Sequence, residues 1–170
     1  MTFSAMPAMR AALVFSAFLI PPALLQAQET AKPFRYDWNG QVGFVLGTCW
    51  HGYTLTGAGG GGEVFVWRGL TLGGDLAAQR FVAHDPVFGL LSTNVGYHFV
   101  NRLRPAKVDP FVNWIIGGAF AEGFFVGANG IGGGLNYWFR EGMGLRTEAR
   151  FQVADAEEGL LMFRIGLAFR

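Results

Sequence analysis

Two segments near the C-terminus, 145–153 and 160–170, alternate strictly between two kinds of side chain. In a β-strand, successive side chains point to opposite faces of the sheet. One face of both segments is mostly large and apolar, and the other carries small, polar or charged residues. A soluble sheet can show this pattern, but a strand between lipid and a polar interior must show it. The outer face would hold Leu145, Thr147, Ala149, Phe151, Val153, Leu161, Phe163, Ile165, Leu167 and Phe169.

Similar segments of about ten residues recur upstream, separated by turn residues. This spacing is typical of transmembrane β-strands, and an even strand number is expected for a single-chain bacterial outer-membrane barrel. The sequence therefore predicts an all-β, eight-stranded, antiparallel up-and-down barrel over 37–170. We expect strands at about 38–49, 59–67, 70–82, 88–100, 109–120, 127–139, 145–153 and 160–170. Periplasmic turns would lie at Arg68–Gly69, 101–108 and 140–143, and outward loops near 50–58, 83–87, 121–126 and 154–159.

The N-terminus has the pattern of a secretory signal peptide. Arg10 precedes the apolar run 11–20, which Pro21 and Pro22 end, and small residues follow up to about Ala27. The run is shorter than the roughly 20 apolar residues that a membrane-spanning helix needs. We expect a cleaved signal peptide at 1–28 and a short periplasmic leader at 29–36.

The composition excludes several classes of protein. Without Arg10 the mature chain would hold 12 basic and 12 acidic residues, and this balance argues against a nucleic-acid binder. Hydrophobic residues make up 51% of the chain, yet no mature segment is long enough to be a membrane-spanning helix. A β-barrel reconciles these two observations. The 26 glycines also argue against an all-α fold.

The inward faces of the expected strands collect polar and charged side chains. An eight-stranded barrel has an interior that side chains can just fill, so buried acids and bases must pair there. We expect a lumen charge network of Glu63, Asp75, Arg146, Glu148, Arg150 and Arg164. Its role is either to hold the barrel shut or to form a narrow, gated pore. Further inward polar residues are Gln79, Asn94, His98, Asn113 and Asn136, and the alternation also turns Trp67 and Trp138 inward.

No pattern of residues indicates catalysis or a cofactor. His51, His84 and His98 lie on different segments and lack the spacing of a metal site. Cys49 is the only cysteine, which excludes an intramolecular disulfide. The glycine-rich run 127–134 does not precede a predicted helix, so it cannot cradle a phosphate as a nucleotide-binding loop does. We expect neither enzymatic activity nor a bound metal or cofactor.

Three segments resemble the small outer-membrane barrels related to the OmpA transmembrane domain and to OmpX-like proteins. They are 108–112, the run 132–139 with 144–151, and the C-terminal strand. The resemblance implies an outer-membrane location in a Gram-negative-type bacterium, with membrane lipid as a partner. It also implies recognition by the barrel-assembly machinery, although such signals typically end on an aromatic residue and this chain ends at Arg170. The assembly signal would comprise Phe163, Ile165, Leu167 and Phe169.

Three functions follow from this interpretation. The first is a structural or surface-interacting outer-membrane barrel. The second is a narrow pore or gated channel, and the third is a soluble, lipocalin-like barrel that binds an apolar ligand. A soluble barrel would reverse the polarity, with apolar side chains inside and charged ones outside.

Overall fold

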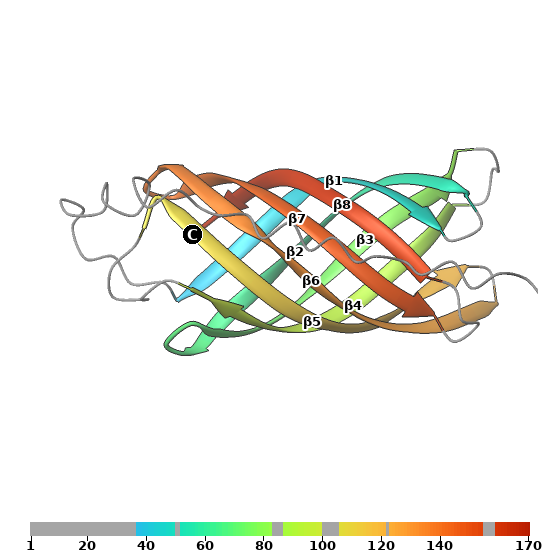
Figure 1. Cartoon of the computed structure of the whole chain (residues 1–170), viewed down its shortest axis with the longest axis horizontal. Coiled ribbons are helices and arrows are strands. Elements are labelled where there is room, and N and C mark those ends of the chain that lie inside the picture. The colour runs from blue at the N-terminus through green and yellow to red at the C-terminus, as the bar shows by residue number, and fades with distance from the viewer. Residues whose placement is uncertain (1–36, 50–51, 83–86, 100–105, 122, 155–158) are drawn as a thin grey trace, which may run out of the picture.

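The computed structural model describes residues 37–49, 52–82, 87–99, 106–121, 123–154 and 159–170. The expected signal peptide and leader lie outside these residues. Eight long strands form the whole of the described fold, inclined to the long axis of the molecule (Figure 1). They are β1 (Trp38–Cys49), β2 (Thr54–Trp67), β3 (Leu70–Phe81), β4 (Val87–His98), β5 (Val108–Ala121), β6 (Phe124–Arg140), β7 (Met143–Ala154) and β8 (Gly159–Phe169).

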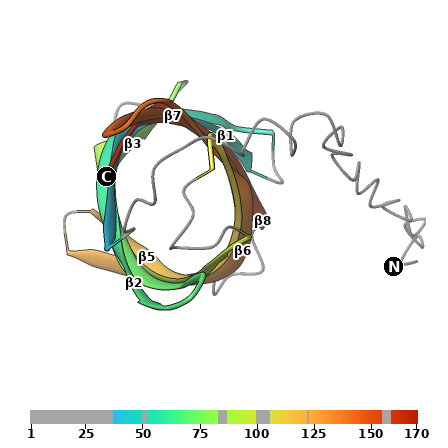
Figure 2. The ribbon, with the colours of Figure 1, turned by 90° about the vertical axis from the view of Figure 1, so that its left-hand side faces the viewer.

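The strands form one closed antiparallel barrel in sequence order. Each strand pairs with the next along the chain, and β8 pairs with β1 from Gly40 opposite Phe169 to Cys49 opposite Leu160. Figure 2 shows the resulting ring of strands. This closure confirms the predicted eight-stranded up-and-down topology. Among the described residues, no helix is long and apolar enough to span a bilayer.

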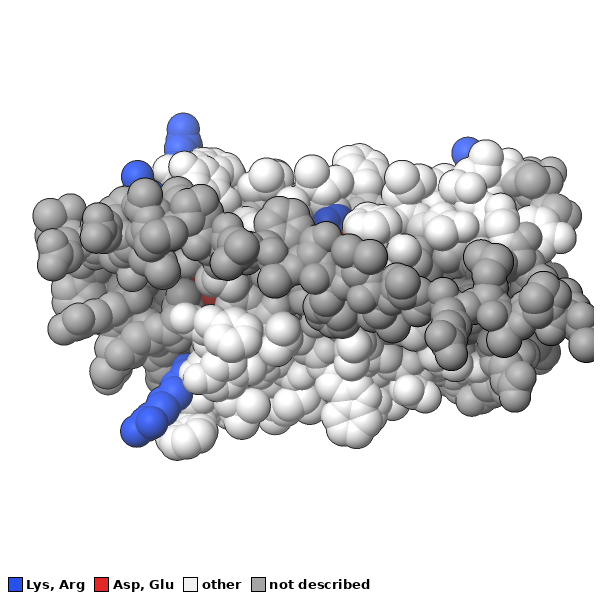
Figure 3. Space-filling model, in the orientation of Figure 1, with Lys and Arg blue, Asp and Glu red and all other residues white. Residues whose placement is uncertain are grey.

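The two faces of the barrel wall differ in the way the alternation predicts. Outward side chains such as Phe44, which is 72% exposed, and Ile165, which is 54% exposed, form an apolar exterior. Figure 3 shows a largely uncharged side wall, with most of the visible Lys and Arg atoms toward its ends. The buried polar residues, among them Gln79 and Asn94, point into the lumen. This polarity is opposite to that of a soluble barrel that carries an apolar ligand.

Two strands begin earlier than the sequence predicts. β2 begins at Thr54, so the expected loop up to residue 58 is wrong, and the glycine-rich run 57–62 belongs entirely to the strand. β6 begins at Phe124, so the expected loop over 121–126 is also wrong: β5 extends through Ala121, and only two residues separate the strands. Glycines and consecutive aromatic residues show no polar–apolar alternation. The alternation therefore does not predict where these strands begin, although their backbones pair with the neighbouring strands.

The two tryptophans expected inside have different environments. Trp138 is 2% exposed and packs against Phe65 in the lumen. Trp67 is 62% exposed, so its predicted inward position is wrong. The register of β2 on β3 shifts between Phe65 and Trp67, and this irregularity reverses the face on which Trp67 lies. Arg68 follows with a φ of 48°, in the tight turn to β3.

Inward glycines on β2 allow the strands to curve tightly around the lumen. A Cβ atom on Gly59 would lie 2.6 Å from the Cβ of Ala77, and one on Gly61 would lie 2.5 Å from the Cβ of Asp75. Real Cβ atoms do not approach so closely, so these two positions require glycine.

Candidate functional site

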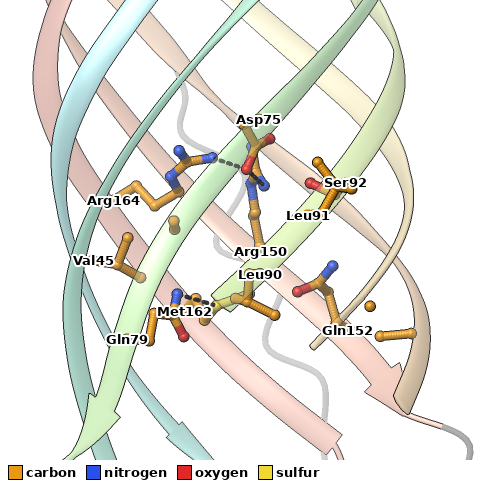
Figure 4. Close-up of a pocket in the computed structure, with 13 residues that line it drawn as sticks. Val45, Asp75, Gln79, Leu90, Leu91, Ser92, Arg150, Gln152, Met162 and Arg164 are labelled. Carbon is orange, nitrogen blue, oxygen red and sulfur yellow. Dashed lines mark hydrogen bonds and ion pairs between the residues drawn. The ribbon is translucent and has the colours of Figure 1, made fainter. Parts of the chain in front are cut away.

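The middle of the lumen contains a compact charged cluster around Asp75 of β3. Arg150 of β7 reaches across the barrel and donates two hydrogen bonds to this carboxylate, at 3.2 Å and 2.9 Å. Arg164 of β8 places Nη1 3.2 Å from Asp75 Oδ1. Figure 4 shows both arginines converging on the carboxylate. A bidentate arginine–carboxylate pair is among the stronger polar contacts in proteins, and here it connects opposite walls.

Glu148 of β7 lies at the centre of the arginines. Its carboxylate accepts a 2.7 Å hydrogen bond from Arg150 Nε and a 2.8 Å hydrogen bond from Asn113 Nδ2. Arg146 Nε and Arg164 Nη1 lie 3.6 Å and 3.7 Å from Oε2. One buried carboxylate therefore partly neutralises three guanidinium groups.

Glu63 of β2 is the third acid of the cluster and lies nearer to the end of the barrel where β1 begins and β8 ends. It accepts a 2.9 Å hydrogen bond from Arg146 Nη1 and a 3.0 Å hydrogen bond from the Thr71 hydroxyl. The Arg146 guanidinium also covers the ring of Phe111, with Cζ 3.7 Å from the ring centroid. The structure thus brings together all six side chains of the expected charge network, with Arg164 more exposed than the others.

Asp109 is a member that the sequence reasoning missed. It is completely buried on β5, where Oδ1 lies 2.7 Å from His98 Nδ1 and Oδ2 accepts a 3.1 Å hydrogen bond from Asn136. The other ring nitrogen of His98 lies 3.2 Å from Glu63 Oε1. The signal was present in the sequence, because Asp109 shares the inward parity of Asn113 four residues later.

The charges of the complete cluster balance. Both ring nitrogens of His98 face carboxylates, which only accept hydrogen bonds, so the geometry suits a doubly protonated ring. Counted this way, four cationic groups face four acids. The cluster, with its amide and hydroxyl partners, has a member on every strand: Asn39, Glu63, Thr71, Asp75, His98, Asp109, Asn113, Asn136, Arg146, Glu148, Arg150 and Arg164. We call this set the lumen network.

Apolar side chains occupy the lumen on both sides of the lumen network. Toward the termini, Phe65 and Trp138 pack with Ala168. Toward the other end, buried residues pack with partly buried ones: Val45, Leu55 and Met162 with Cys49, Phe81, Leu90 and Leu160. Of these apolar residues only Trp138 was expected inside, although the others also lie on the inward parity.

A small cavity lies between the lumen network and the second apolar layer. It has a volume of about 20 Å³, and Asp75, Gln79, Arg150, Met162 and Arg164 are among its lining residues (Figure 4). That volume is enough for about one water molecule. At this level of the described barrel, side chains therefore leave little free space in the lumen.

The arrangement offers no open site for substrate or metal among the described residues. No group of three or more metal-ligating side chains occurs there. His51 and His84 lie outside the described residues, and the His98 side chain is completely buried. His98 and Asp109 therefore stabilise the barrel from within and have no exposed surface on which to meet a substrate.

The four residues of the expected assembly signal lie on β8. Phe163, Ile165 and Leu167 point outward from the barrel wall and are exposed, and Phe169 is half-buried. Arg170 follows, with its guanidinium 4.2 Å from the ring centroid of Trp138 and its Nε donating to the Glu141 carbonyl oxygen at 2.7 Å.

Solved structures share this fold. Neisserial surface protein A (NspA) has a TM-score of 0.61 at 12% identity, over 78% of this chain and 96% of that chain. The N-terminal β-barrel domain of Pseudomonas aeruginosa OprF has a TM-score of 0.56 at 16% identity, over 77% and 97%. Ail, the attachment invasion locus protein of Yersinia pestis, has a TM-score of 0.56 at 11% identity, over 80% and 99%. No family model matches the chain, and no curated protein matches it. At these identities, the likeness confirms the small eight-stranded barrel fold.

Proposed function

We propose that this protein is an integral outer-membrane barrel of a Gram-negative-type bacterium, permanently closed, with a structural or surface-interacting role. The apolar exterior supports the membrane location. If this barrel stood in water, its outer wall would expose a far larger apolar patch than soluble proteins do. The likeness to NspA, named a surface protein, and to barrels from Pseudomonas and Yersinia supports the same location.

One observation carries the closed state: paired charges and two apolar layers together fill the lumen. Opening a water-filled path would require several buried ion pairs to separate and two apolar layers to move aside. Breaking even one buried pair is costly, so we favour the closed barrel over the gated pore. The rim and the exterior then remain as the surfaces that can interact with other molecules.

Conductance across planar bilayers tests the closed state. The refolded protein should give no step-like current increases under conditions in which a sixteen-stranded porin, as positive control, opens readily. Reproducible unitary steps from the purified barrel would overturn the closed state and favour the narrow pore.

Cell fractionation tests the location independently. The protein should remain with outer membranes after salt and carbonate washes, and its band should shift when the sample is boiled before electrophoresis. Recovery in a soluble fraction, with binding of an apolar ligand, would instead support the lipocalin-like alternative.

The β8 face supports recognition by the barrel-assembly machinery as a further part of this proposal. Its outward apolar residues are available along the strand before the barrel inserts. Membrane lipid is the other expected partner.

A further inference from the structure

An open groove crosses the outer wall near the end of the barrel away from the termini. It is shallow and open to the surroundings, and its lining includes Phe44 of β1, Thr56 and Ala58 of β2, and Ala78 and Arg80 of β3. We call it the outer groove.

Small residues continue the floor of the outer groove toward the middle of the barrel. The outward positions of β2 after Ala58 are Gly60, which lies between Val42 of β1 and Leu76 of β3, and Gly62, which lies between Gly40 and Gly74. From Thr56 to Gly62 the strand rises about 20 Å. At the usual tilt of about 40°, this corresponds to about 15 Å along the membrane normal, or roughly one leaflet.

Barrel closure does not force this smooth surface along its whole length. A Cβ atom on outward Gly60 would lie 2.8 Å from the Gln41 carbonyl oxygen, which is too close, whereas one on outward Gly62 would make a tight contact with the Asn39 carbonyl oxygen at 3.2 Å. Inward Gly61, by contrast, would clash directly with Asp75. Packing therefore explains Gly60 and Gly61, and of these glycines only Gly62 is left open to another explanation.

The outer groove carries a cation at its rim. Arg80 is exposed, lies one residue before the end of β3, and has no ion-pair partner among the described residues. Among those residues it is the only charged side chain on the outward face in this half of the barrel. An arginine at this level of a membrane lies among lipid headgroups, where phosphate oxygens match its fork of donors.

We propose that the outer groove binds one acyl chain of a phosphorylated lipid, with Arg80 holding the phosphate. The apolar floor fits a hydrocarbon chain, and the rim cation fits an anionic headgroup. The proposal rests on the membrane location proposed above and gives that exterior a preferred lipid.

Native mass spectrometry of the refolded barrel in a non-ionic detergent tests the headgroup contact. The probes are dimyristoyl phosphatidate and dimyristoyl phosphatidylcholine, which differ only in the headgroup. One basic residue near anionic lipid corresponds to about a fivefold preference for phosphatidate. Arg80→Gln should abolish this preference, whereas the matched control Arg140→Gln, at the opposite end, should retain it.

Filling the groove tests the acyl-chain contact. Ala58→Phe should weaken the binding of both lipids severalfold, and Ala149→Phe, on the outward face of β7, should not. Ala78→Phe replaces Ala58→Phe if the latter does not fold, and a band shift on boiling verifies the fold of each variant.

Three results would overturn the proposal: preference retained in Arg80→Gln, preference lost equally in Arg140→Gln, or equal lipid binding in Ala58→Phe and Ala149→Phe. A dimer without lipid preference would assign the groove to a second copy of the chain and would also overturn it. A barrel that fractionates with outer membranes yet fails these tests would refute only the lipid site. A soluble protein would refute the membrane location itself.

Discussion

Replacing Glu148 with glutamine is the sharpest test of the lumen network. The substitution keeps the shape of a completely buried side chain but removes the charge that Arg146, Arg150 and Arg164 share. Asp75 can still hold Arg150, and the amide oxygen of glutamine can still accept one hydrogen bond. Removing one partner of a buried ion pair usually costs about 3–5 kcal/mol of stability. Because these contacts remain, we expect the free energy of unfolding to fall by about 3 kcal/mol, at the lower end of that range. That loss lowers the folding equilibrium constant more than a hundredfold.

Urea-induced unfolding from lipid vesicles, followed by tryptophan fluorescence, measures this loss as a shift of midpoint at constant slope. Glu141→Gln, in the exposed β6–β7 turn, is the control and should stay within about 0.5 kcal/mol of the wild type. The double variant Glu148→Gln with Arg164→Gln should lose less than the sum of the two single losses, because it removes a surplus positive charge. A loss below about 1 kcal/mol for Glu148→Gln would refute the reasoning, since it would mean that water screens the lumen charges.

Three further variants test other features. Gly61→Ala should destabilise the barrel by about 1–3 kcal/mol in the same urea assay, because its methyl group has no space, whereas Gly62→Ala should cost less, because only the Asn39 carbonyl oxygen at 3.2 Å has to shift. Equal losses would contradict the assignment of inward and outward faces. Arg170→Ala should cost about 0.5–1 kcal/mol through the lost contact with Trp138, and an unchanged midpoint would argue against that contact. Phe169→Ser should lower the amount of folded protein in cellular outer membranes, measured as the band that shifts on boiling, without slowing refolding into vesicles. Normal assembly of this variant in cells would count against the β8 signal.

The alternation along 145–153 explains why so much of the fold could be predicted. Arg146, Glu148 and Arg150 are charged residues at every second position, and only a strand with a polar inner face accommodates them. The same parity placed Glu63 and Asp75 inward on β2 and β3. Matching of these two acids with the arginines of 145–153 and Arg164 across the lumen follows from the same parity, but which arginine meets which acid could not be predicted, because the individual contacts depend on strand tilt.

The remaining errors have a common physical origin in residues that carry no polar–apolar contrast. Apolar residues such as Leu55 and Met162 can lie either in an apolar layer of the lumen or on the lipid-facing exterior. The alternation of polar and apolar residues therefore does not predict the inner apolar layer. Trp67 lies on the outward face because an irregular pairing between β2 and β3 shifts the alternation by one residue. The sequence shows no pattern that would predict this irregularity.

The ion pairs across the lumen also constrain the order in which the barrel can form. Arg146 and Arg150 of β7 pair with Glu63 and Asp75 of β2 and β3, which are separated from them by 83 and 75 residues in the chain. In the ring, β1 and β8 lie between these strands, so the partners face each other only after the last strand has joined the first. These contacts should be absent from the transition state for closure and present only afterwards. Interactions of that kind slow opening more than they speed closing, so the buried charges would act chiefly to prolong the lifetime of the closed ring.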